Sequence, residues 1–319
     1  MPEVGEELDR PAGVRVAFVT ASDPRVVAED TDRRLHDRAF AELGVALDHV
    51  GWDEPGADWA GYDLVVIRSP WDYPERLPDF LAWLDGVDGR APLHNPAGVV
   101  RWNLDKRYLV ALAGLGVPVV PTAFATSAAE ATAAIERVDL DGDRAGEVVV
   151  KPTVSAGSRD TGRFARSDPA ALALADRIVG GGRAVMVQPA VPSVAERGEV
   201  AHVLVDGELS HAYRKGPLLA TGGGLLSGDE YVEVREPVVA PAAWVDLARQ
   251  VHDAACELLV AAGALDLGPL LYARIDLVEL PSGEPALLEA ELFEPMLSVD
   301  LEPGAPARFA HACLERATR

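Results

Sequence analysis

The chain has 319 residues, a formal net charge of −22, 49% hydrophobic residues and 25% charged residues. This length allows two or three packed units with a sizeable core, and the acidic balance argues against a nucleic-acid surface, which needs a basic stripe. No apolar run reaches the roughly 20 residues of a membrane span, and the polar N-terminus is unlike a signal peptide. We therefore expect a cytoplasmic protein with small-molecule partners, no nucleic acid and no membrane. Cys256 and Cys313 show no zinc or CxxC spacing, and we interpret them as small buried hydrophobes.

The first hundred residues predict a small α/β unit over 14–98, after a disordered leader at 1–13. Apolar runs predict strands at 14–20, 45–50 and 64–68, and helical periodicity predicts helices over 31–43 and 77–84. Gly44 is well placed to end the first helix. This order of elements favours a mostly parallel sheet.

An aromatic segment follows the strand at 64–68. Ligands of open α/β sheets bind at the carboxyl ends of strands, and here the chain places Arg68, Trp71, Asp72 and Tyr73. Arg68 suits bidentate binding of a carboxylate, and the aromatic rings offer walls with polar tips. A proline-rich loop whose aromatic rings cover the core fits the same residues equally well.

Two lysines occupy positions that suit phosphate binding. Asn103 is a candidate N-cap of a helix ending near residue 115, which places Lys106 in the first turn, where the helix dipole disfavours a cation unless an anion binds beside it. Lys151 ends a strand at 147–150 and precedes a loop of small residues whose backbone N–H groups could bind phosphate. An ordinary surface turn is the alternative. That loop contains Ser155, Ala156, Gly157 and Ser158.

A hairpin is predicted at 200–215, because Asp206-Gly207 separates two alternating runs and favours a type I′ turn. Strict pairing from this turn places His202, His211, Tyr213 and Lys215 on one face, and Glu199 and Arg214 on the other. Two histidines on one face suggest a metal, but no third ligand is spaced with them. Neutral, hydrogen-bonded histidines are the favoured interpretation. Further helices are predicted at 128–137, 168–178, 241–262 and 306–316, and a strand at 184–188.

A second hairpin is predicted at 271–294, with a turn at 281–284. If Leu280 pairs with Pro285, Asp276 lies opposite Glu289 and Arg274 lies opposite Glu291, all on one face. Hard cations such as Mg²⁺ take oxygen ligands from carboxylates of this kind. A solvated sheet face with cross-strand ion pairs is the alternative.

Together these motifs resemble the ATP-grasp superfamily in order and approximate spacing, over about residues 98–300. Trp102-Asn103-Leu104-Asp105-Lys106, the lysine at 151 with its loop, and Arg274-x-Asp276 followed by Glu289-x-Glu291 carry the resemblance. It implies an α/β (α+β) ATP-grasp fold in which a central unit (99–186) and a C-terminal unit (187–319) clasp ATP. Glu291 stands where this family more often has Asn.

The resemblance also implies roles for individual residues. Nucleotide contacts are expected from Lys106, Lys151, the loop of Ser155, Ala156, Gly157 and Ser158, Gln188 at the adenine, Glu199 at the ribose and Lys215 at the γ-phosphate. A bulge would be needed to bring Glu199 and Lys215 to one face. Two Mg²⁺ ions are expected on Asp276, Glu289 and Glu291, while Arg274 and Lys215 stabilise the charge in transit.

Within the superfamily, Trp71-Asp72-Tyr73 and the ending Leu292-Phe293-Glu294-Pro295 are similar to the cycloserine-biosynthesis cyclo-ligase group. This implies a carboxylate–amine ligase that forms an amide or cyclic amide through an acyl phosphate, on an amino acid or a related metabolite. Candidates for recognising the acceptor are Arg68, Trp71, Asp72, Tyr73 and Glu294. The glycine-rich run at 222–228 replaces an Arg-containing segment of that group, so the substrate does not carry over. A non-catalytic nucleotide-binding protein, a kinase-like enzyme and a homodimeric assembly all stay open.

Overall fold

The N-terminal unit is a parallel sheet covered on both faces. The computed structural model describes residues 13–140, 146–224 and 233–319, so the predicted leader lies outside the described residues except for Gly13. The sheet has the order β2-β1-β3-β4 and consists of β1 (Arg15–Thr20), β2 (Ala46–Gly51), β3 (Leu64–Ser69) and β4 (Leu93–His94). Its helical segments are α1 (Pro24–Val27), α2 (Arg33–Glu42), η1 (Trp59–Gly61), η2 (Tyr73–Glu75) and α3 (Leu77–Val87). Because α2 packs on one face and α3 on the other, β1 and β3 are apolar almost throughout.

The central unit is an antiparallel sheet with two helices on one face. Its strands have the order β5-β8-β6-β7 and are β5 (Ala123–Ala125), β6 (Glu147–Pro152), β7 (Gly162–Ala165) and β8 (Val185–Pro189). Val148 and Val150 of β6 pack beneath α6 (Ala128–Arg137) and α7 (Pro169–Gly180). The alternating residues Val149 and Lys151 therefore face the opposite side, which is the side of the site described below.

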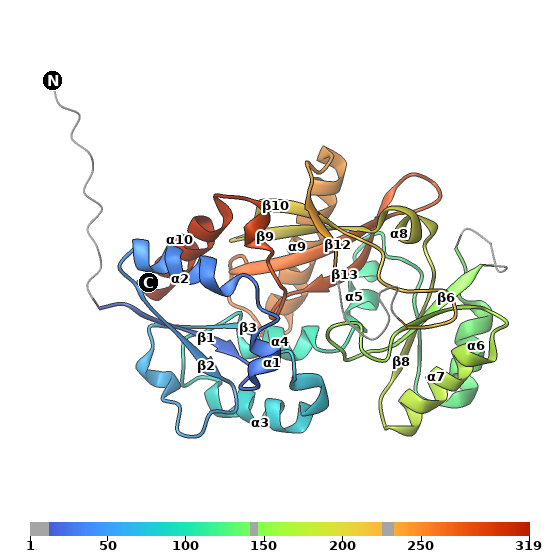
Figure 1. The fold of residues 1–319 in the computed structure, drawn as a ribbon, viewed down its shortest axis with the longest axis horizontal. Helices are drawn as coiled ribbons and strands as arrows, with labels where there is room; N and C mark the ends of the chain where they lie inside the picture. Colours follow the sequence, from blue (N-terminus) through green and yellow to red (C-terminus); the bar gives the residue numbers. More distant parts are fainter. Residues whose placement is uncertain (1–12, 141–145, 225–232) are drawn as a thin grey trace.

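The C-terminal unit is a five-stranded antiparallel sheet with the order β11-β10-β9-β12-β13. The strands are β9 (Glu199–Val205), β10 (Glu208–Lys215), β11 (Arg235–Pro237), β12 (Tyr272–Glu279) and β13 (Pro285–Glu291), and α8 (Pro192–Arg197) precedes them. One face packs on α9 (Ala242–Ala261), together with α4 (Ala97–Asn103) and α5 (Tyr108–Gly114), which come earlier in the chain. At one end, the other face packs on η3 (Val299–Leu301) and α10 (Ala305–Ala317), and α10 also contacts α2 (Figure 1). Among the described residues, no helix has the length and apolarity needed to cross a membrane.

The pairing of β12 with β13 confirms the predicted cross-strand partners. Asp276 lies opposite Glu289 and Arg274 opposite Glu291. The predicted pairing of Leu280 with Pro285 is wrong, because Glu279 pairs with Pro285 instead. Leu288 is an extra residue on β13, and this bulge restores the register between the turn and the carboxylates.

The pairing of β9 with β10 corrects the predicted faces. Lys215 lies directly opposite Glu199, whereas strict counting from the turn placed them apart. The register shifts between Leu209 and His211, so one extra residue turns the rest of β10 over. His202 pairs with Ala212 and therefore does not share a face with His211. Both histidines contact backbone carbonyls, and burial lowers the pKa of each, as expected for neutral sheet histidines.

The segment around Lys106 also differs from the prediction. Asn103 is the last residue of α4 and caps no helix, and Lys106 lies in the turn between α4 and α5. The buried Asn103 amide donates to the carbonyl of Ala290 at 2.9 Å and accepts from the N–H of Leu292 at 2.7 Å. The Asn103 side chain that the sequence suggested as a helix cap therefore forms tertiary hydrogen bonds at the end of β13 instead.

Candidate active site

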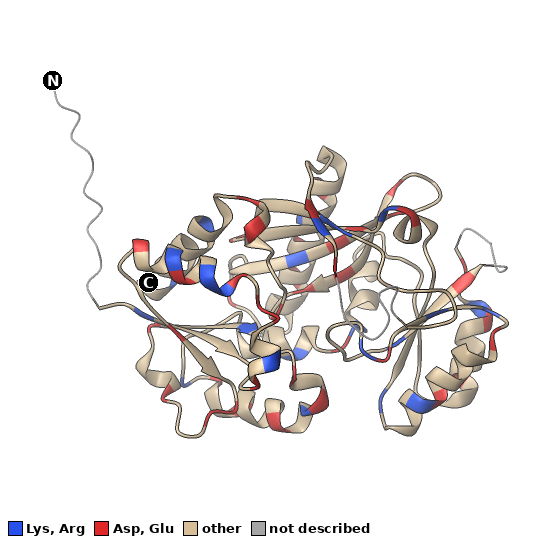
Figure 2. Ribbon diagram, in the orientation of Figure 1, with Lys and Arg blue, Asp and Glu red and all other residues tan. Residues whose placement is uncertain are grey.

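A cavity of about 720 Å³ lies where the central sheet, the C-terminal sheet and the N-terminal unit meet. Its walls include Val149 and Lys151 of β6 and Gln188 and Pro189 at the end of β8. Charged residues of β10, β12 and β13 complete them. Segments of both charge signs occur on the strands at the centre of the molecule (Figure 2). The predicted site residues that line it are Trp71, Lys106, Lys151, Ser155, Ala156, Gly157, Ser158, Gln188, Glu199, Lys215, Arg274, Glu289, Glu291 and Glu294.

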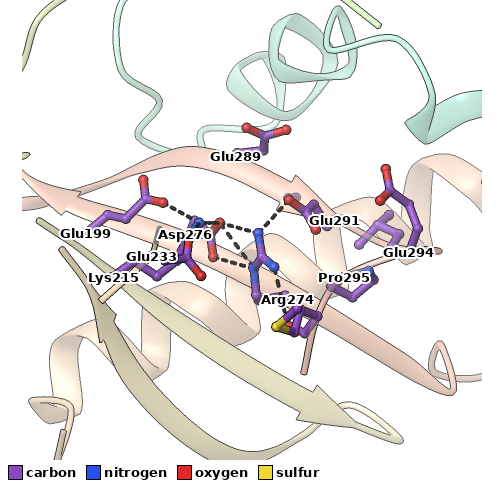
Figure 3. A network of polar contacts seen from close by, with 12 residues as sticks. Glu199, Lys215, Glu233, Arg274, Asp276, Glu289, Glu291, Glu294 and Pro295 are labelled. Atoms are coloured by element: carbon purple, nitrogen blue, oxygen red, sulfur yellow. Dashed lines mark hydrogen bonds and ion pairs between the residues drawn. The ribbon is translucent and has the colours of Figure 1, made fainter. Parts of the chain in front are cut away.

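Lys215 is at the centre of a buried ion-pair network (Figure 3). Its Nζ lies 3.1 Å from Oδ2 of Asp276, forms an ion pair with Glu199, and lies 3.8 Å from Glu233. Burial opposes a charged lysine, but the carboxylates of Asp276 and Glu199 outweigh it and raise the pKa of Lys215 well above its ordinary value. The ammonium therefore stays charged at neutral pH, as a phosphate ligand must.

Arg274 connects the two strands of the second hairpin. Its Nε donates to Oδ1 of Asp276 at 2.9 Å, and its Nη2 donates to Glu291 across the strands. Asp276 itself is 1% exposed and is not among the residues lining the cavity. Burial opposes the charge on Asp276, but Arg274 and Lys215 outweigh it and lower the pKa of this carboxyl. Burial raises the pKa of Glu291 to about 7, with Arg274 opposing the shift.

Glu289 pairs with the two lysines of the central part of the chain. Nζ of Lys106 lies 3.0 Å from its Oε1, and Nζ of Lys151 lies 3.4 Å from its Oε2. Burial opposes the charge, yet the two ammonium groups hold the pKa of Glu289 well below its ordinary value. Two cations and one carboxylate from three separate segments therefore meet at one point of the cavity.

The Lys106 turn is also tied to the loop that follows β6. The backbone N–H of Lys106 donates to the carbonyl of Thr153 at 3.0 Å, and Thr153 Oγ1 donates to Asp105 at 3.0 Å. Nζ of Lys106 donates to the carbonyl of Ser155 at 3.3 Å. The Asp105-Lys106 motif therefore positions the small-residue loop as well as supplying a cation.

The acceptor candidates divide into residues at the cavity and residues beneath it. Trp71 and Glu294 line the cavity, while Arg68, Asp72 and Tyr73 are absent from its described lining. Arg68 is 1% exposed and donates to the carbonyl of Pro295 at 3.0 Å. Asp72 accepts from the indole N–H of Trp52, and Tyr73 donates to Glu294 at 2.8 Å. The buried residues Arg68 and Tyr73 therefore support the segment that carries Glu294, while Asp72 holds Trp52 within the N-terminal unit.

Gln188 is the second-to-last residue of β8 and lines the cavity. Its side chain is 2% exposed and donates to Thr122 Oγ1 at 3.0 Å, so it fixes the strand end. The following residues Pro189, Ala190 and Val191 continue the wall, with Leu288 of the bulge also lining the cavity. This apolar section is suited to a flat ring.

Several lining residues were missed by sequence reasoning. Arg235 lies opposite Lys215 on the neighbouring strand β11, while Glu29 and Thr31 reach the cavity from the N-terminal unit. Glu233 is held near Lys215. Of these residues, only Arg235 has a sequence feature that could have marked it, because it is a lone cation in a short strand-like run. Its pairing with β10 could not be predicted from sequence spacing.

Comparison with known proteins identifies the family. The family model of the N-terminal domain of D-cycloserine synthetase DcsG matches residues 16–95. The cycloserine biosynthesis protein DcsG of Streptomyces lavendulae is 38% identical over 280 residues, which cover 87% of this chain and 91% of that protein. The chain belongs to the DcsG family. The crystal structure of D-cycloserine synthetase DcsG matches with a TM-score of 0.85 at 34% identity, covering 95% of this chain and 99% of that chain.

More distant structures share the fold. A D-alanine–D-alanine ligase from Bacillus anthracis complexed with ATP has a TM-score of 0.63 at 13% identity, covering 96% of this chain and 98% of that one. A RimK domain ATP-grasp protein from Sphaerobacter thermophilus has a TM-score of 0.63 at 19% identity, covering 94% and 100%. The expected ATP-grasp fold, the resemblance to the cycloserine-biosynthesis group and the ligase class are confirmed.

Proposed function

We propose that this DcsG-family protein is an ATP-dependent carboxylate–amine ligase that forms an amide or cyclic amide through an acyl phosphate. Its substrate is an amino acid or a small metabolite derived from one. The observation that carries the proposal is the convergence of Lys106, Lys151 and Lys215 on the carboxylates of β12 and β13 at one cavity. Cations from distant segments, gathered where charge must be transferred, are the arrangement that phosphoryl transfer requires.

The nucleotide roles follow the walls of the cavity. Gln188 and the apolar wall after it receive the adenine, and Glu199 receives the ribose. Lys106, Lys151 and the loop of Ser155, Ala156, Gly157 and Ser158 bind the phosphates. Lys215 and Arg274 stabilise the phosphoryl group in transit, and the small-residue loop keeps water from the acyl phosphate.

The donor chemistry of the hairpin fits Mg²⁺. Asp276, Glu289 and Glu291 offer only carboxylate oxygens from one face, and the latter two line the cavity. Within the described parts of the chain, no three acidic, histidine or cysteine side chains are already gathered as a metal site. Each carboxylate is instead ion-paired, so the phosphates must draw the lysines away from Glu289 before it can coordinate metal. When bound, Mg²⁺ would neutralise phosphate charge, and we assign two ions to these three residues.

The chemistry proceeds in two displacements. A carboxylate oxygen of the substrate attacks the γ-phosphorus, and the bond to the β-phosphate oxygen breaks to release ADP. The amine nitrogen then attacks the acyl carbon, and inorganic phosphate leaves. Trp71 and Glu294 contact the substrate, while Arg68, Asp72 and Tyr73 hold the surrounding backbone and side chains in place.

We retain the unit boundaries of 14–98, 99–186 and 187–319, with α4 and α5 packing on the C-terminal sheet although they lie in the central range. We also retain a cytoplasmic location and small-molecule partners, with a homodimer as one candidate assembly.

Product analysis tests the proposal. The protein is incubated with Mg·ATP and a panel of amino acids, singly and in pairs, while ADP, AMP and phosphate are followed. We expect ADP and phosphate in equal amounts, only with a particular substrate. AMP with pyrophosphate would show adenylate chemistry and contradict the proposal, and so would ADP with a stable phosphorylated product.

A further inference from the structure

Glu294 differs from the other predicted acidic residues of the cavity wall. Glu199, Glu289 and Glu291 each form an ion pair with a lysine or arginine. Glu294 is only 8% exposed and lines the cavity, yet no cation lies within ion-pair distance of it in the described chain. A buried carboxyl without a cation requires some other reason for its position.

Its position is fixed by the N-terminal unit. Oε1 accepts a hydrogen bond of 2.8 Å from the hydroxyl of Tyr73, and the backbone carbonyl accepts one of 2.9 Å from the indole of Trp71. Tyr73 is 2% exposed and packs against Phe80 and Phe293. Among the described residues, no hydrogen bond is made to Oε2. One carboxyl oxygen is therefore anchored, and the other is left for a molecule in the cavity.

The surroundings allow this carboxyl to change protonation near neutral pH. The charges that act on it are those of Glu291 on β13, Lys106 between α4 and α5, and Arg274 on β12, and the Tyr73 hydroxyl donates a hydrogen bond to it. Burial and Glu291 raise the pKa of Glu294 to about 8, while the Tyr73 hydrogen bond and the two cations oppose the shift. Glu289, in contrast, is held ionised by its two lysines.

We propose that Glu294 accepts the proton of the attacking amine, with Tyr73 as its positioning residue. This inference rests on the proposed ligase function. The nitrogen lone pair forms the C–N bond with the acyl carbon, and the C–O bond to phosphate breaks with its electron pair on the departing phosphate. The N–H proton moves to Oε2 of Glu294 and passes to water when the products leave. The substrate nucleophile is therefore a nitrogen that still carries a proton to lose.

Hydroxylamine separates this proton transfer from carboxylate activation, because it is unprotonated at neutral pH and traps acyl phosphates as hydroxamates without a base. Wild type, Glu294→Gln and the control Glu29→Gln, an exposed carboxyl at the cavity, are compared with Mg·ATP and the active panel substrates. We expect Glu294→Gln to lower the ratio of amide to hydroxamate by about a hundredfold, which is within the range for loss of a general base. The control should keep the ratio within about twofold of wild type.

Tyr73→Phe provides the second test, because phenylalanine keeps the ring packing and removes only the hydroxyl. The hydrogen bond from Tyr73 favours the ionised carboxyl, so its loss should move the rise of the amide-forming rate to higher pH. The hydroxamate rate should keep its pH profile. Equal losses of amide and hydroxamate in Glu294→Gln, or an unshifted amide profile in Tyr73→Phe, would overturn the inference. Wild type that forms no hydroxamate with any panel carboxylate would instead refute the proposed function, and the inference would fall with it.

Discussion

Replacing Glu289 by glutamine separates the two roles assigned to this carboxylate. In the protein without nucleotide, Glu289 neutralises Lys106 and Lys151, whose side chains are 8% and 12% exposed, while its own is 21% exposed. Breaking a fully buried ion pair costs about 3–5 kcal/mol. Because this site is partly open to solvent, we expect the free energy of unfolding to fall by about 2 kcal/mol. At about 2 °C per kcal/mol for a protein of this size, Tm should fall by about 4 °C.

The same substitution should strengthen the binding of ADP without metal. In wild type the phosphates must displace Glu289 from both lysines, whereas in Glu289→Gln the lysines are already available. We expect Kd for ADP in the presence of EDTA to fall about tenfold, equivalent to about 1.4 kcal/mol, while turnover with Mg·ATP is lost. Calorimetric titration measures the affinity. Glu291→Gln is the matched control, because Glu291 pairs with Arg274 and neither of these lysines. Weaker metal-free ADP binding by Glu289→Gln would refute the idea that this carboxylate competes with phosphate.

Three further predictions concern binding, folding and pH. Lys151→Ala should weaken Mg·ATP binding at least about tenfold by removing one charge-assisted phosphate contact, and an unchanged Kd would rule out its phosphate role. Asn95→Ala should lower the free energy of unfolding by about 3 kcal/mol in urea titrations, because the fully buried amide donates to the carbonyl of Tyr272 and accepts from the N–H of Leu271, both at 2.8 Å; a loss below about 1 kcal/mol would contradict this. For Glu294, the folded-state pKa of about 8 lies above the ordinary 4.5, so the protonated carboxyl favours the folded state at low pH and this contribution is lost as pH rises to about 8. Burial lowers the pKa of His36 and of His202 below the ordinary 6.5, so these two histidines contribute little above that pH. Between pH 6.5 and 8.5 the Tm of wild type should therefore fall more than the Tm of Glu294→Gln; parallel Tm curves would contradict the shift.

The sequence predicted those parts of the fold that depend on local pattern. Apolar runs located β1, β2 and β3 of the parallel sheet but not the two-residue β4, and the turn before Pro285 placed Asp276 opposite Glu289. That success depended on two departures that cancel, a turn entered one residue earlier and a bulge at Leu288. In the first hairpin a single bulge near Ser210 was enough to turn Lys215 to the face of Glu199. Side-chain periodicity carries no mark of an extra residue, so these registers could be settled only by the structure.

Sequence reasoning identified the site residues that belong to charged motifs. It did not predict the partners of side chains that contact distant parts of the chain. Lys106, Lys151 and Lys215 were identified by type and order, and the structure brings them to one cavity. Asn is a common helix-capping residue, but the amide of Asn103 instead bonds to the backbone carbonyl of Ala290 and the backbone N–H of Leu292. Leaving these buried backbone groups without a hydrogen bond would cost more free energy than leaving a turn uncapped. Tyr73 was assigned to the substrate, whereas its hydroxyl faces Glu294 inside the core. Distance along the chain, 221 residues in this case, hides such pairs from sequence reasoning.

Oxygen transfer from the substrate tests the acyl-phosphate mechanism most directly. The active carboxylate substrate is labelled with oxygen-18 in its carboxyl group, and the products with Mg·ATP are analysed by mass spectrometry. The mechanism predicts one labelled oxygen in the inorganic phosphate, because the carboxylate oxygen that attacks the γ-phosphorus leaves with it. Label in AMP, or phosphate that carries none, would contradict the assignment of Lys106, Lys151 and Lys215 to γ-phosphoryl transfer.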